Sequence, residues 1–411
     1  MADQMQWANA LSTRPSLEAA IADVVERTVS SLTAPADLGL VFISSAFASE
    51  YSRVLPLLAE KLSVPVLIGC SGGGVIGTSL GGETQELEAE AALSLTLAHL
   101  PGVNLQVFHV VADDLPDLDS SPDAWVDLIG VSPSSTPQFI ILSSAFSSGI
   151  NDLLQGLDFA YPGSVIVGGQ ATAGGFAGRL ALFAHDSRSG INQSLYREGT
   201  VGLALSGNIV LETIVAQGCK PIGQPVQVTK AERNIILEID EQVPLMVLRD
   251  LISSLSEEER TLAQHSLFVG VAMDEFKLSL QPGDFLIRTI LGVDPSGGAI
   301  AIGDLVRPGQ RLQFHLRDAQ ASADDLAFLL ERYQQQSRLN YPAVGALMFS
   351  CVGRGEGLYG KPNFDSELFR RYLSDIPIGG FFCGGEIGPI GGRTFLHGYT
   401  SVFGICRQQE W

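Results

Sequence analysis

The residues best suited to chemistry lie near the end of the chain, in the run Cys383-Gly384-Gly385-Glu386-Ile387-Gly388-Pro389, with His397 soon after. Backbone N–H groups of a glycine-rich turn can bind an anion, and a carboxylate such as that of Glu386 can bind an ammonium group. An amino acid needs this pairing. The alternative is a tight turn between two buried strands, in which Glu386 accepts hydrogen bonds from nearby backbone amides. The candidate ligand contacts here are Cys383, Gly384, Gly385, Glu386, Gly388 and His397.

A second candidate group is basic and consists of Arg288, His315 and Arg317. Gln313, His315 and Arg317 alternate along an expected strand, so their side chains share one face. Such a face could hold a carboxylate through a bidentate arginine contact. The alternative is pairing with aspartates that are close in sequence, namely Asp294, Asp304 and Asp318.

A third candidate is the loop GCSGGG at residues 69–74, whose Ser71, Gly72 and Gly73 could contact a ligand. The loop lacks the Lys-Ser/Thr pair of a phosphate-binding P-loop, and an alternating strand follows it instead of a helix. Catalysis by Ser71 would require a strand-turn-helix context and a base. We therefore expect neither a nucleotide nor another cofactor here, and we assign no catalytic residue.

The positions of the cysteines and histidines limit the reactive thiols and metal sites that we expect. Cys383 would be reactive if its pKa were lowered, with His397 as an activator, but an inert buried thiol is the expected state. The six histidines are scattered without H-x-H or H-x₃-H spacing, so we expect no metal site. The five cysteines include no C-x-x-C pair. Reduced thiols of a cytoplasmic protein are expected.

An internal repeat positions these residues. Residues 42–69 and 141–168 both contain SSAF and end in an apolar step to glycine, at one constant offset. These segments begin copy one and copy two, and a looser copy three runs from Ala346 to Gly380. In each copy a short apolar strand, an amphipathic helix and a second strand predict a parallel β-α-β unit. A glycine-rich loop follows, such as residues 168–175 in copy two.

Alternating strands after the glycine loops predict hairpins, at residues 93–97 with 105–110 and at 201–205 with 209–215. The predicted fold class is therefore α/β, with repeated β-α-β-plus-hairpin units that form mixed sheets with helices on their outer faces. Because 411 residues exceed one ordinary core, we expect two domains. The predicted boundaries are an N-terminal helical segment at 1–37 with a helix over 16–32, a first domain at 38–240 with two repeats, and a second at 241–411.

Composition excludes several classes of partner. The formal net charge of −20 argues against nucleic acid and against anionic lipid, because both need clustered Lys and Arg. No apolar run reaches about 18 residues, so no membrane insertion is expected. The N-terminus has no basic region before an apolar core, so no signal peptide is expected.

The glycine-rich motifs together resemble those of the FIST family. The resemblance rests on IGCSGGGVIG, on GDFLIRTILGVDPSGGAIAIGD with FHLRDA, and on CGGEIGPIGG with HGYTS. It covers roughly residues 38–395 and implies a FIST N-terminal and a FIST C-terminal domain. It also implies a sensory module for small ligands, with amino acids as the candidate ligand class. Related eukaryotic chains join these domains to an F-box.

These considerations favour a cytoplasmic small-ligand-binding sensor that acts on a separate signalling protein. One alternative is a protein-interaction scaffold, which predicts a large exposed apolar patch and a filled glycine-loop region. The other is an enzyme that uses Glu386, Cys383 and His397, which predicts these side chains in one cleft.

Overall fold

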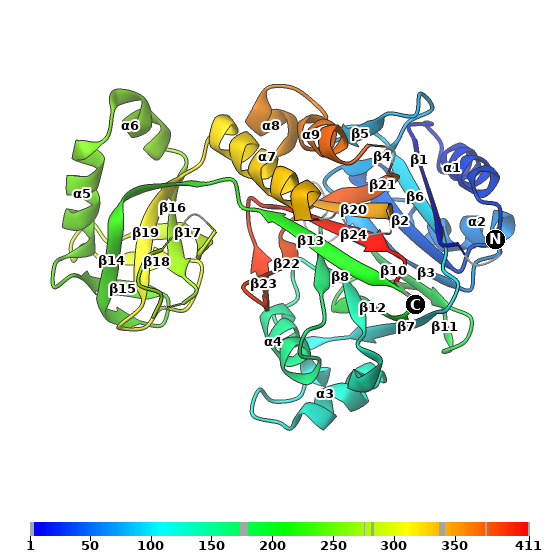
Figure 1. The fold of residues 1–411 in the computed structure, drawn as a ribbon, viewed down its shortest axis with the longest axis horizontal. Coiled ribbons are helices and arrows are strands. Elements are labelled where there is room, and N and C mark those ends of the chain that lie inside the picture. Colours follow the sequence, from blue (N-terminus) through cyan, green and yellow to red (C-terminus); the bar gives the residue numbers. More distant parts are fainter. Residues whose placement is uncertain are drawn as a thin grey trace. The chain divides into compact units, whose positions relative to one another are not determined.

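The computed structural model describes residues 4–172, 180–274, 276–280, 283–336, 342–374 and 376–409, and the fold is mixed α/β (Figure 1). The chain forms two compact units. The larger unit comprises Met1–Val215 and Leu329–Trp411, and the smaller unit comprises Ala216–Phe328. Within the described part of the chain, no helix is both long and apolar enough to span a membrane.

In its described residues, the larger unit contains three six-stranded sheets with the same internal order. The first sheet runs β1 (Gln6–Ser12), β6 (Leu93–His99), β2 (Leu38–Ser44), β3 (Val66–Gly72), β10 (Leu182–Asp186), β11 (Ile191–Tyr196). The second runs β7 (Val103–Val110), β12 (Thr200–Gly207), β8 (Gln138–Ser144), β9 (Ile166–Ala171), β22 (Glu386–Ile390), β23 (Arg393–His397). The third runs β13 (Val210–Ala216), β24 (Ser401–Arg407), β20 (Ala343–Cys351), β21 (Ile378–Cys383), β4 (Val75–Thr78), β5 (Thr84–Leu87).

Each sheet is centred on the β-α-β unit of one copy. Its parallel pair is β2–β3, β8–β9 or β20–β21, as the repeat predicts. The two strands after each glycine loop form a ribbon, and this ribbon joins the sheet of a different copy. The β4–β5 ribbon of copy one pairs with β21, the β10–β11 ribbon of copy two with β3, and the β22–β23 ribbon of copy three with β9. The three copies thus exchange ribbons in a closed cycle.

The predicted hairpins are wrong in their pairing. β6 pairs with β1 and β2, whereas β7 pairs with β12, so the turn at Pro101-Gly102 carries the chain from one sheet to the next. The second predicted hairpin fails in the same way, because β12 lies in the second sheet and β13 in the third. Both strand pairs have the alternating pattern that predicts a hairpin. This pattern indicates that a strand has one buried face, but it does not indicate which strand lies next to it.

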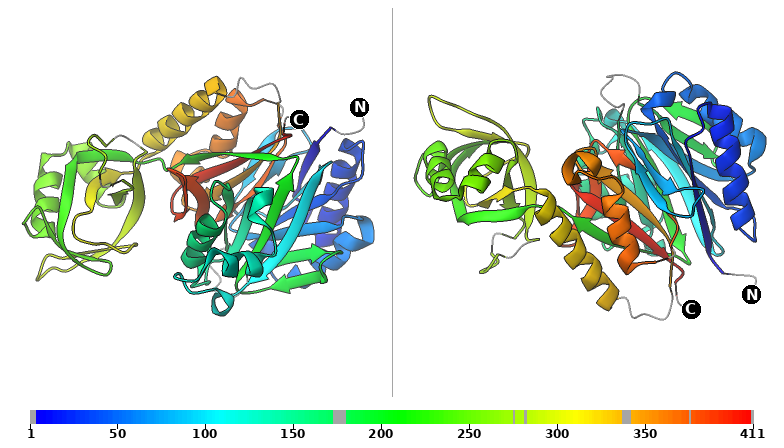
Figure 2. Two further views of the ribbon diagram at one scale, coloured as in Figure 1. Left: turned by 60° about the horizontal axis from the view of Figure 1, so that its bottom comes forward. Right: turned by 90° about the horizontal axis from the view of Figure 1, so that it is seen from above.

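Helices cover the outer faces of the sheets, as predicted (Figure 2). α1 (Leu17–Ser31) and α2 (Tyr51–Lys61) pack on the first sheet, and α3 (Pro122–Ile129) and α4 (Ile150–Ala160) pack on the second. On the third sheet, α9 (Phe364–Tyr372) stacks Phe369 on Phe403 and is preceded by α8 (Gly355–Tyr359). The inner faces of all three sheets share one apolar core.

The N-terminal segment 1–37 is only partly helical. The predicted helix over 16–32 matches α1, and the Ser16 side chain accepts the N–H of Ala19 as its cap. Residues 6–12, however, form the edge strand β1, which pairs antiparallel with β6 along its whole length. The sequence QWANALS has too few polar alternations to indicate a strand, and its pairing partner lies more than eighty residues away.

The SSAF motifs of copies one and two are not structurally equivalent. Val41 pairs with Gly69 in copy one and Ile141 with Gly168 in copy two, so the first strands are separated by 100 residues and the glycines by 99. The constant offset is therefore wrong by one residue in the first strand. The consequence is visible at the motif phenylalanines, because Phe47 is 3% exposed and Phe146 is 66% exposed.

The described part of the smaller unit contains a closed barrel and short helices that pack on it. Its strands, in barrel order, are β14 (Lys220–Glu232), β15 (Ile235–Ile239), β18 (Ile300–Ile302), β17 (Phe285–Val293), β16 (Leu267–Ala272) and β19 (Arg311–Leu316). α5 (Pro244–Ser254) and α6 (Glu257–Ala263) pack on its apolar core. The barrel is followed by α7 (Ala319–Gln336), and the Asp318 carboxylate accepts the N–H of Ala321 in its first turn.

The compact units do not follow the linear division expected near residue 240. Residues 329–411 belong to the larger unit, and the barrel interrupts that unit between β13 and the C-terminal part of α7. The physical reason is the third sheet, in which β20 and β21 of copy three pair with β24 and β4. The segment 241–411, expected as one domain, is therefore distributed over both units.

Candidate functional site

The glycine loops of the three copies meet at one place, which we call the glycine junction (residues 69–74, 168–172 and 380–386). Gly69, Gly168 and Gly380 occupy the same register position, opposite Val41, Ile141 and Met348. A Cβ at these glycines would lie 2.0, 1.8 and 1.9 Å from the facing carbonyl oxygens. Glycine is required here because the neighbouring backbone leaves no space for a side chain.

Backbone hydrogen bonds link the three loops in a ring. Copy one is joined to copy three by the N–H of Gly73, which donates to the Phe382 carbonyl at 3.0 Å. Copy two is joined to copy one by the N–H of Thr172, which donates to the Ser71 carbonyl at 3.2 Å. Copy three is joined to copy two by the N–H of Gly384, which donates to the Gln170 carbonyl at 2.9 Å. The sequence repeat thus predicts three loops, and the structure brings them into mutual contact.

These bonds limit what the loops can bind. The N–H groups of Gly73 and Gly384 already donate to protein carbonyls, so neither is available to cradle an anion without breaking a buried hydrogen bond. Ser71 is also engaged, because its hydroxyl donates to the Thr172 carbonyl and accepts the N–H of Ala181, both at 3.0 Å. Residues 173–175 of the expected copy-two loop lie outside the described residues.

Glu386 is the residue that breaks the equivalence of the copies. In each ribbon, the residue that begins the first strand pairs with the residue directly after Gly380, Gly69 or Gly168 in the neighbouring sheet. That first residue is Val75 in copy one, Leu182 in copy two and Glu386 in copy three. Val75 and Leu182 belong to the inner apolar core, and Glu386 is 0% exposed. Its carboxylate accepts the N–H of Thr400 at 3.0 Å, which matches the structural alternative considered for this residue.

His397 lies directly opposite Glu386 in the β22–β23 pair and is buried. Its Nε2 lies 3.0 Å from the Gly388 carbonyl, and because a carbonyl only accepts, Nε2 carries the proton and donates. Gly388 itself is needed for packing, since a Cβ there would lie 2.9 Å from a methyl of Val215. The structure therefore brings Glu386, His397 and Gly388 together, with the imidazole bonded to the backbone.

Cys383 does not have the properties of a nucleophile. Burial raises the pKa of its thiol well above the ordinary value, and the nearby Glu386 carboxylate raises it further. The thiol S–H donates to the Phe381 carbonyl at 3.5 Å. A protonated, buried thiol is poorly nucleophilic, because the thiolate is the reactive form.

The basic candidates lie in the smaller unit and do not form a cationic trio. Arg288 on β17 is paired with Asp304, at 2.6 Å between its Nε and Oδ2, as in the pairing alternative. Burial lowers the pKa of His315 to about 4, so its imidazole is neutral near pH 7. Arg317 follows directly after β19 and is 7% exposed. β16 lies between β17 and β19 in the barrel, so Arg288 and His315 are not on adjacent strands.

A buried charged cluster was missed by sequence reasoning. Arg354 forms a bidentate pair with Asp365, at 2.7 Å from Nε and 3.0 Å from an Nη, and both residues are 0% exposed. The Tyr359 hydroxyl donates to the Asp365 carboxylate at 2.8 Å. Glu86 of β5 accepts the N–H of Ser366 in α9 at 2.7 Å. Burial, and secondarily the charge of Asp365, raises the pKa of Glu86 to about 7.

Among the ranges that the structure describes, no group of three His, Cys, Asp or Glu side chains could hold a metal ion. The residues at the glycine junction are also poor metal ligands, because the thiol of Cys383 is held protonated by burial.

Known proteins share both halves of this architecture. The FIST N domain matches residues 37–242 and the FIST C domain matches residues 244–389. The two matches meet close to the boundary expected near residue 240, within the barrel-containing part of the chain, whereas the compact units change at Ala216 and Phe328.

Similar chains occur in mycobacteria. The "Uncharacterized protein Rv0628c" of Mycobacterium tuberculosis is 32% identical over 397 residues, which covers 96% of this chain and 98% of the relative. The "Uncharacterized protein Mb0898c" of Mycobacterium bovis is 33% identical over 369 residues, 90% of each chain. A shorter likeness, 48% identity over 42 residues and 10% of each chain, links this protein to the human "F-box only protein 22". Because the two FIST domains together match most of the sequence, this protein belongs to the FIST family.

Proposed function

We propose that this protein is a cytoplasmic small-ligand-binding sensory protein that reports the occupancy of its ligand site to a separate signalling protein. The first support is the family, since FIST domains are associated with sensory signal transduction. The second support is the substitution at Glu386 within the glycine junction.

The observation that carries the proposal is the burial of Glu386 at a position that is Val75 in copy one and Leu182 in copy two. Burying an ionised carboxylate costs several kcal/mol more than burying an aliphatic side chain of similar size. The fold itself is satisfied by an aliphatic residue there, as the other two copies demonstrate. A costly group at a position that packing does not require favours a role in binding.

The chemistry of Glu386 favours a ligand with an ammonium group, and we propose an amino acid as the candidate. The carboxylate would bind the ammonium group. The carboxylate of the ligand would need a partner other than the N–H groups of Gly73 and Gly384, because these already donate within the junction. Contacts from Ser71, Gly72, Gly385 and His397 complete the proposed surroundings.

The junction is also suited to transmit occupancy. Its backbone bonds join the loops of all three copies, and each loop leads directly into a ribbon of another sheet. A ligand that binds one arrangement of the ribbons more tightly shifts the population toward that arrangement. A separate partner protein would read this shift.

The test compares wild-type protein with Glu386→Gln and with the surface control Glu60→Gln, each titrated with individual amino acids in a thermal-denaturation assay. A ligand that binds only the folded state raises Tm, and the rise grows with the logarithm of its concentration once this exceeds Kd. We expect the rise in the wild type and in Glu60→Gln and its loss in Glu386→Gln. An equal rise in Glu386→Gln, or no rise with any amino acid, would overturn the assignment.

A protein-interaction scaffold is the second candidate, and exposed apolar residues on the smaller unit favour it. Phe276 is 90% exposed and Leu278 is 101% exposed, and Leu305 and Leu291 are 73% and 63% exposed. Loss of partner capture on replacing Phe276 and Leu278 by serine, without any ligand-dependent change in Tm for the wild type, would favour the scaffold.

A further inference from the structure

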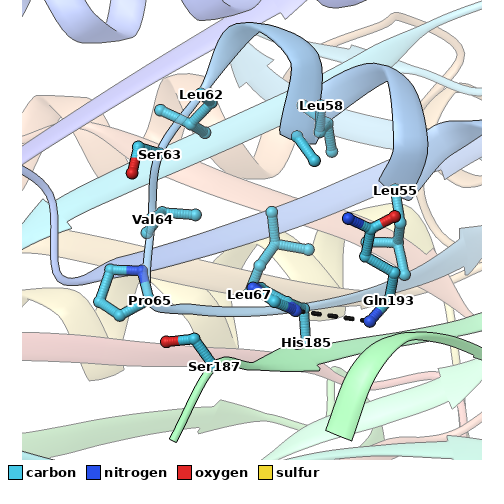
Figure 3. A pocket seen from close by; sticks show the side chains of 11 residues that line it. Leu55, Leu58, Leu62, Ser63, Val64, Pro65, Leu67, His185, Ser187 and Gln193 are labelled. Atoms are coloured by element: carbon cyan, nitrogen blue, oxygen red, sulfur yellow. Dashed lines mark hydrogen bonds between the residues drawn. The ribbon is translucent and has the colours of Figure 1, made fainter.

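A cavity of about 330 Å³ lies between two segments of copy one, the C-terminal half of α2 and the chain that enters β3, and the β10–β11 ribbon of copy two (Figure 3). All its lining residues belong to the larger unit. Its volume is at the lower end of the range for small-molecule pockets, about 300–1,000 Å³. We call it the helix–ribbon pocket.

In the other two copies, a carboxylate hydrogen-bonds the corresponding helix to its ribbon. In copy two, Asp158 of α4 accepts the N–H and the hydroxyl of Thr394 in β23, at 2.6 and 2.8 Å. In copy three, Glu86 of β5 accepts the N–H of Ser366 in α9 at 2.7 Å. In copy one the same helix–ribbon interface contains the pocket. The departure from the repeat is therefore local to α2 and its ribbon.

The pocket combines an apolar floor with a few polar groups. Leu55, Leu58, Val64 and Leu67 are buried and form the floor, and Figure 3 shows their side chains around the space. The principal polar group is His185 of β10. Its Nδ1 accepts the backbone N–H of Gln193 at 3.4 Å, so Nε2 carries the proton and is a hydrogen-bond donor.

The backbone conformation of Gln193, in β11 beside the pocket, supports a role of this strand in ligand binding. Its φ angle is 44°, in the left-handed region that residues other than glycine rarely adopt. This conformation places the Gln193 N–H on His185 and keeps the Gln193 side chain in the lining. Uncommon backbone conformations of this kind concentrate at ligand-binding sites.

The lining specifies the charge of the occupant. None of the eleven lining residues is Asp, Glu, Lys or Arg. An ion that entered would lose hydration without gaining a counter-ion, whereas a neutral molecule would gain apolar burial and one or two hydrogen bonds. We propose that the helix–ribbon pocket binds a short, uncharged aliphatic molecule with one oxygen-containing head group, an alcohol or a ketone, whose oxygen accepts from His185 Nε2. This site is separate from Glu386 and does not depend on the function proposed above.

The experiment uses the full chain and four probes of similar length: 1-hexanol, 2-hexanone, hexanoate and hexylammonium. Binding is measured by protein-observed NMR and by the rise in Tm. We expect the alcohol and the ketone to bind at least about tenfold more tightly than either ion, because each ion is desolvated without a partner. Tighter binding of hexanoate or hexylammonium, or no binding of any probe, would overturn the proposal.

Two variants and a matched control locate the site. Ala59→Phe fills the pocket from an exposed helical position, and Ser52→Phe places the same ring on an exposed position of α2 outside the lining. Ala59→Phe should abolish binding of 1-hexanol, and Ser52→Phe should not change it. His185→Phe keeps the ring and removes the donor, so it should weaken binding roughly tenfold. Unchanged binding in Ala59→Phe would place the probe elsewhere and contradict the assignment.

Discussion

Replacing Glu86 with glutamine should remove a pH dependence of stability that the wild-type fold carries. Burial, and then the charge of Asp365, raises the pKa of Glu86 from 4.5 to about 7. Between pH 4.5 and about pH 7, the Glu86 carboxyl keeps its proton in the folded state and releases it in the unfolded state. The free energy of unfolding of the wild type therefore falls as pH rises through this window, and the loss is complete above pH 7.

The magnitude follows from the size of the shift. A difference of about 2.5 pKa units corresponds to ~3 kcal/mol at pH 8 relative to pH 4. Glutamine does not ionise, and its side-chain oxygen can still accept the N–H of Ser366. Glu86→Gln should therefore be close to the wild type in stability at pH 5 and more stable by ~2–3 kcal/mol at pH 8.

The assay is guanidinium denaturation of both proteins at half-unit steps from pH 4.5 to 8. Other titrating groups contribute equally to both proteins, so the difference between their unfolding free energies isolates Glu86. The control is Glu367→Gln, which removes an exposed carboxylate from the same helix α9. A constant difference between Glu86→Gln and the wild type over the whole pH range would refute the reasoning.

Three further outcomes follow from the structure. Gly69→Ala should destabilise the larger unit by more than ~3 kcal/mol or prevent folding, because its Cβ would lie 2.0 Å from a backbone carbonyl, whereas Gly357→Ala, which has open space, should not; urea unfolding compares them. The pKa of His315 is lowered to about 4 by burial, so stability should rise with pH from about 4 to 6.5, and His315→Leu should lack this rise in pH-dependent denaturation. Arg354→Met should cost roughly 3–5 kcal/mol by leaving Asp365 buried without its partner, and the double variant Arg354→Met/Asp365→Leu should recover part of that loss; additive single effects would contradict the pairing.

Local features of the chain could be predicted because their causes are local. The helix over Leu17–Ser31 has its cap at Ser16 and an apolar stripe at helical spacing. The parallel pairs β2–β3 and β8–β9 follow from short apolar strands joined through a helix. In each case the determining residues lie within one or two turns of the element that they specify.

The choice of strand partners could not be predicted, because it depends on residues far apart in the chain. The turn at Gly102 has the composition of a hairpin turn, yet β6 and β7 enter different sheets. A hydrogen bond to copy two holds this turn instead. Asn208, in the corresponding turn of copy two, donates its N–H to the Gly102 carbonyl. Alternating apolar residues are buried equally well whichever strand lies alongside. The pairing of β6 and β7 is therefore determined only when all three copies are assembled.

The sequence repeat indicates a glycine-rich loop in each copy, but not the hydrogen bonds that these loops make. The glycine loops do converge, but whether their N–H groups bind a ligand or one another depends on carbonyls of other copies. Glu86 and Ser366 are 280 residues apart, and no local pattern indicates that they meet. The helix–ribbon pocket also has no sequence signature, because it lies between a helix of copy one and a ribbon of copy two that are far apart in the chain.

The most direct test of the central claim is isothermal titration calorimetry of the wild-type protein with amino acids, repeated with Glu386→Val. The substitution introduces the residue that copy one has at the equivalent position, Val75. We predict saturable binding of an amino acid to the wild type and none to a folded Glu386→Val. Equal affinity in both proteins, or no binding to either, would contradict the claim that Glu386 marks a ligand site.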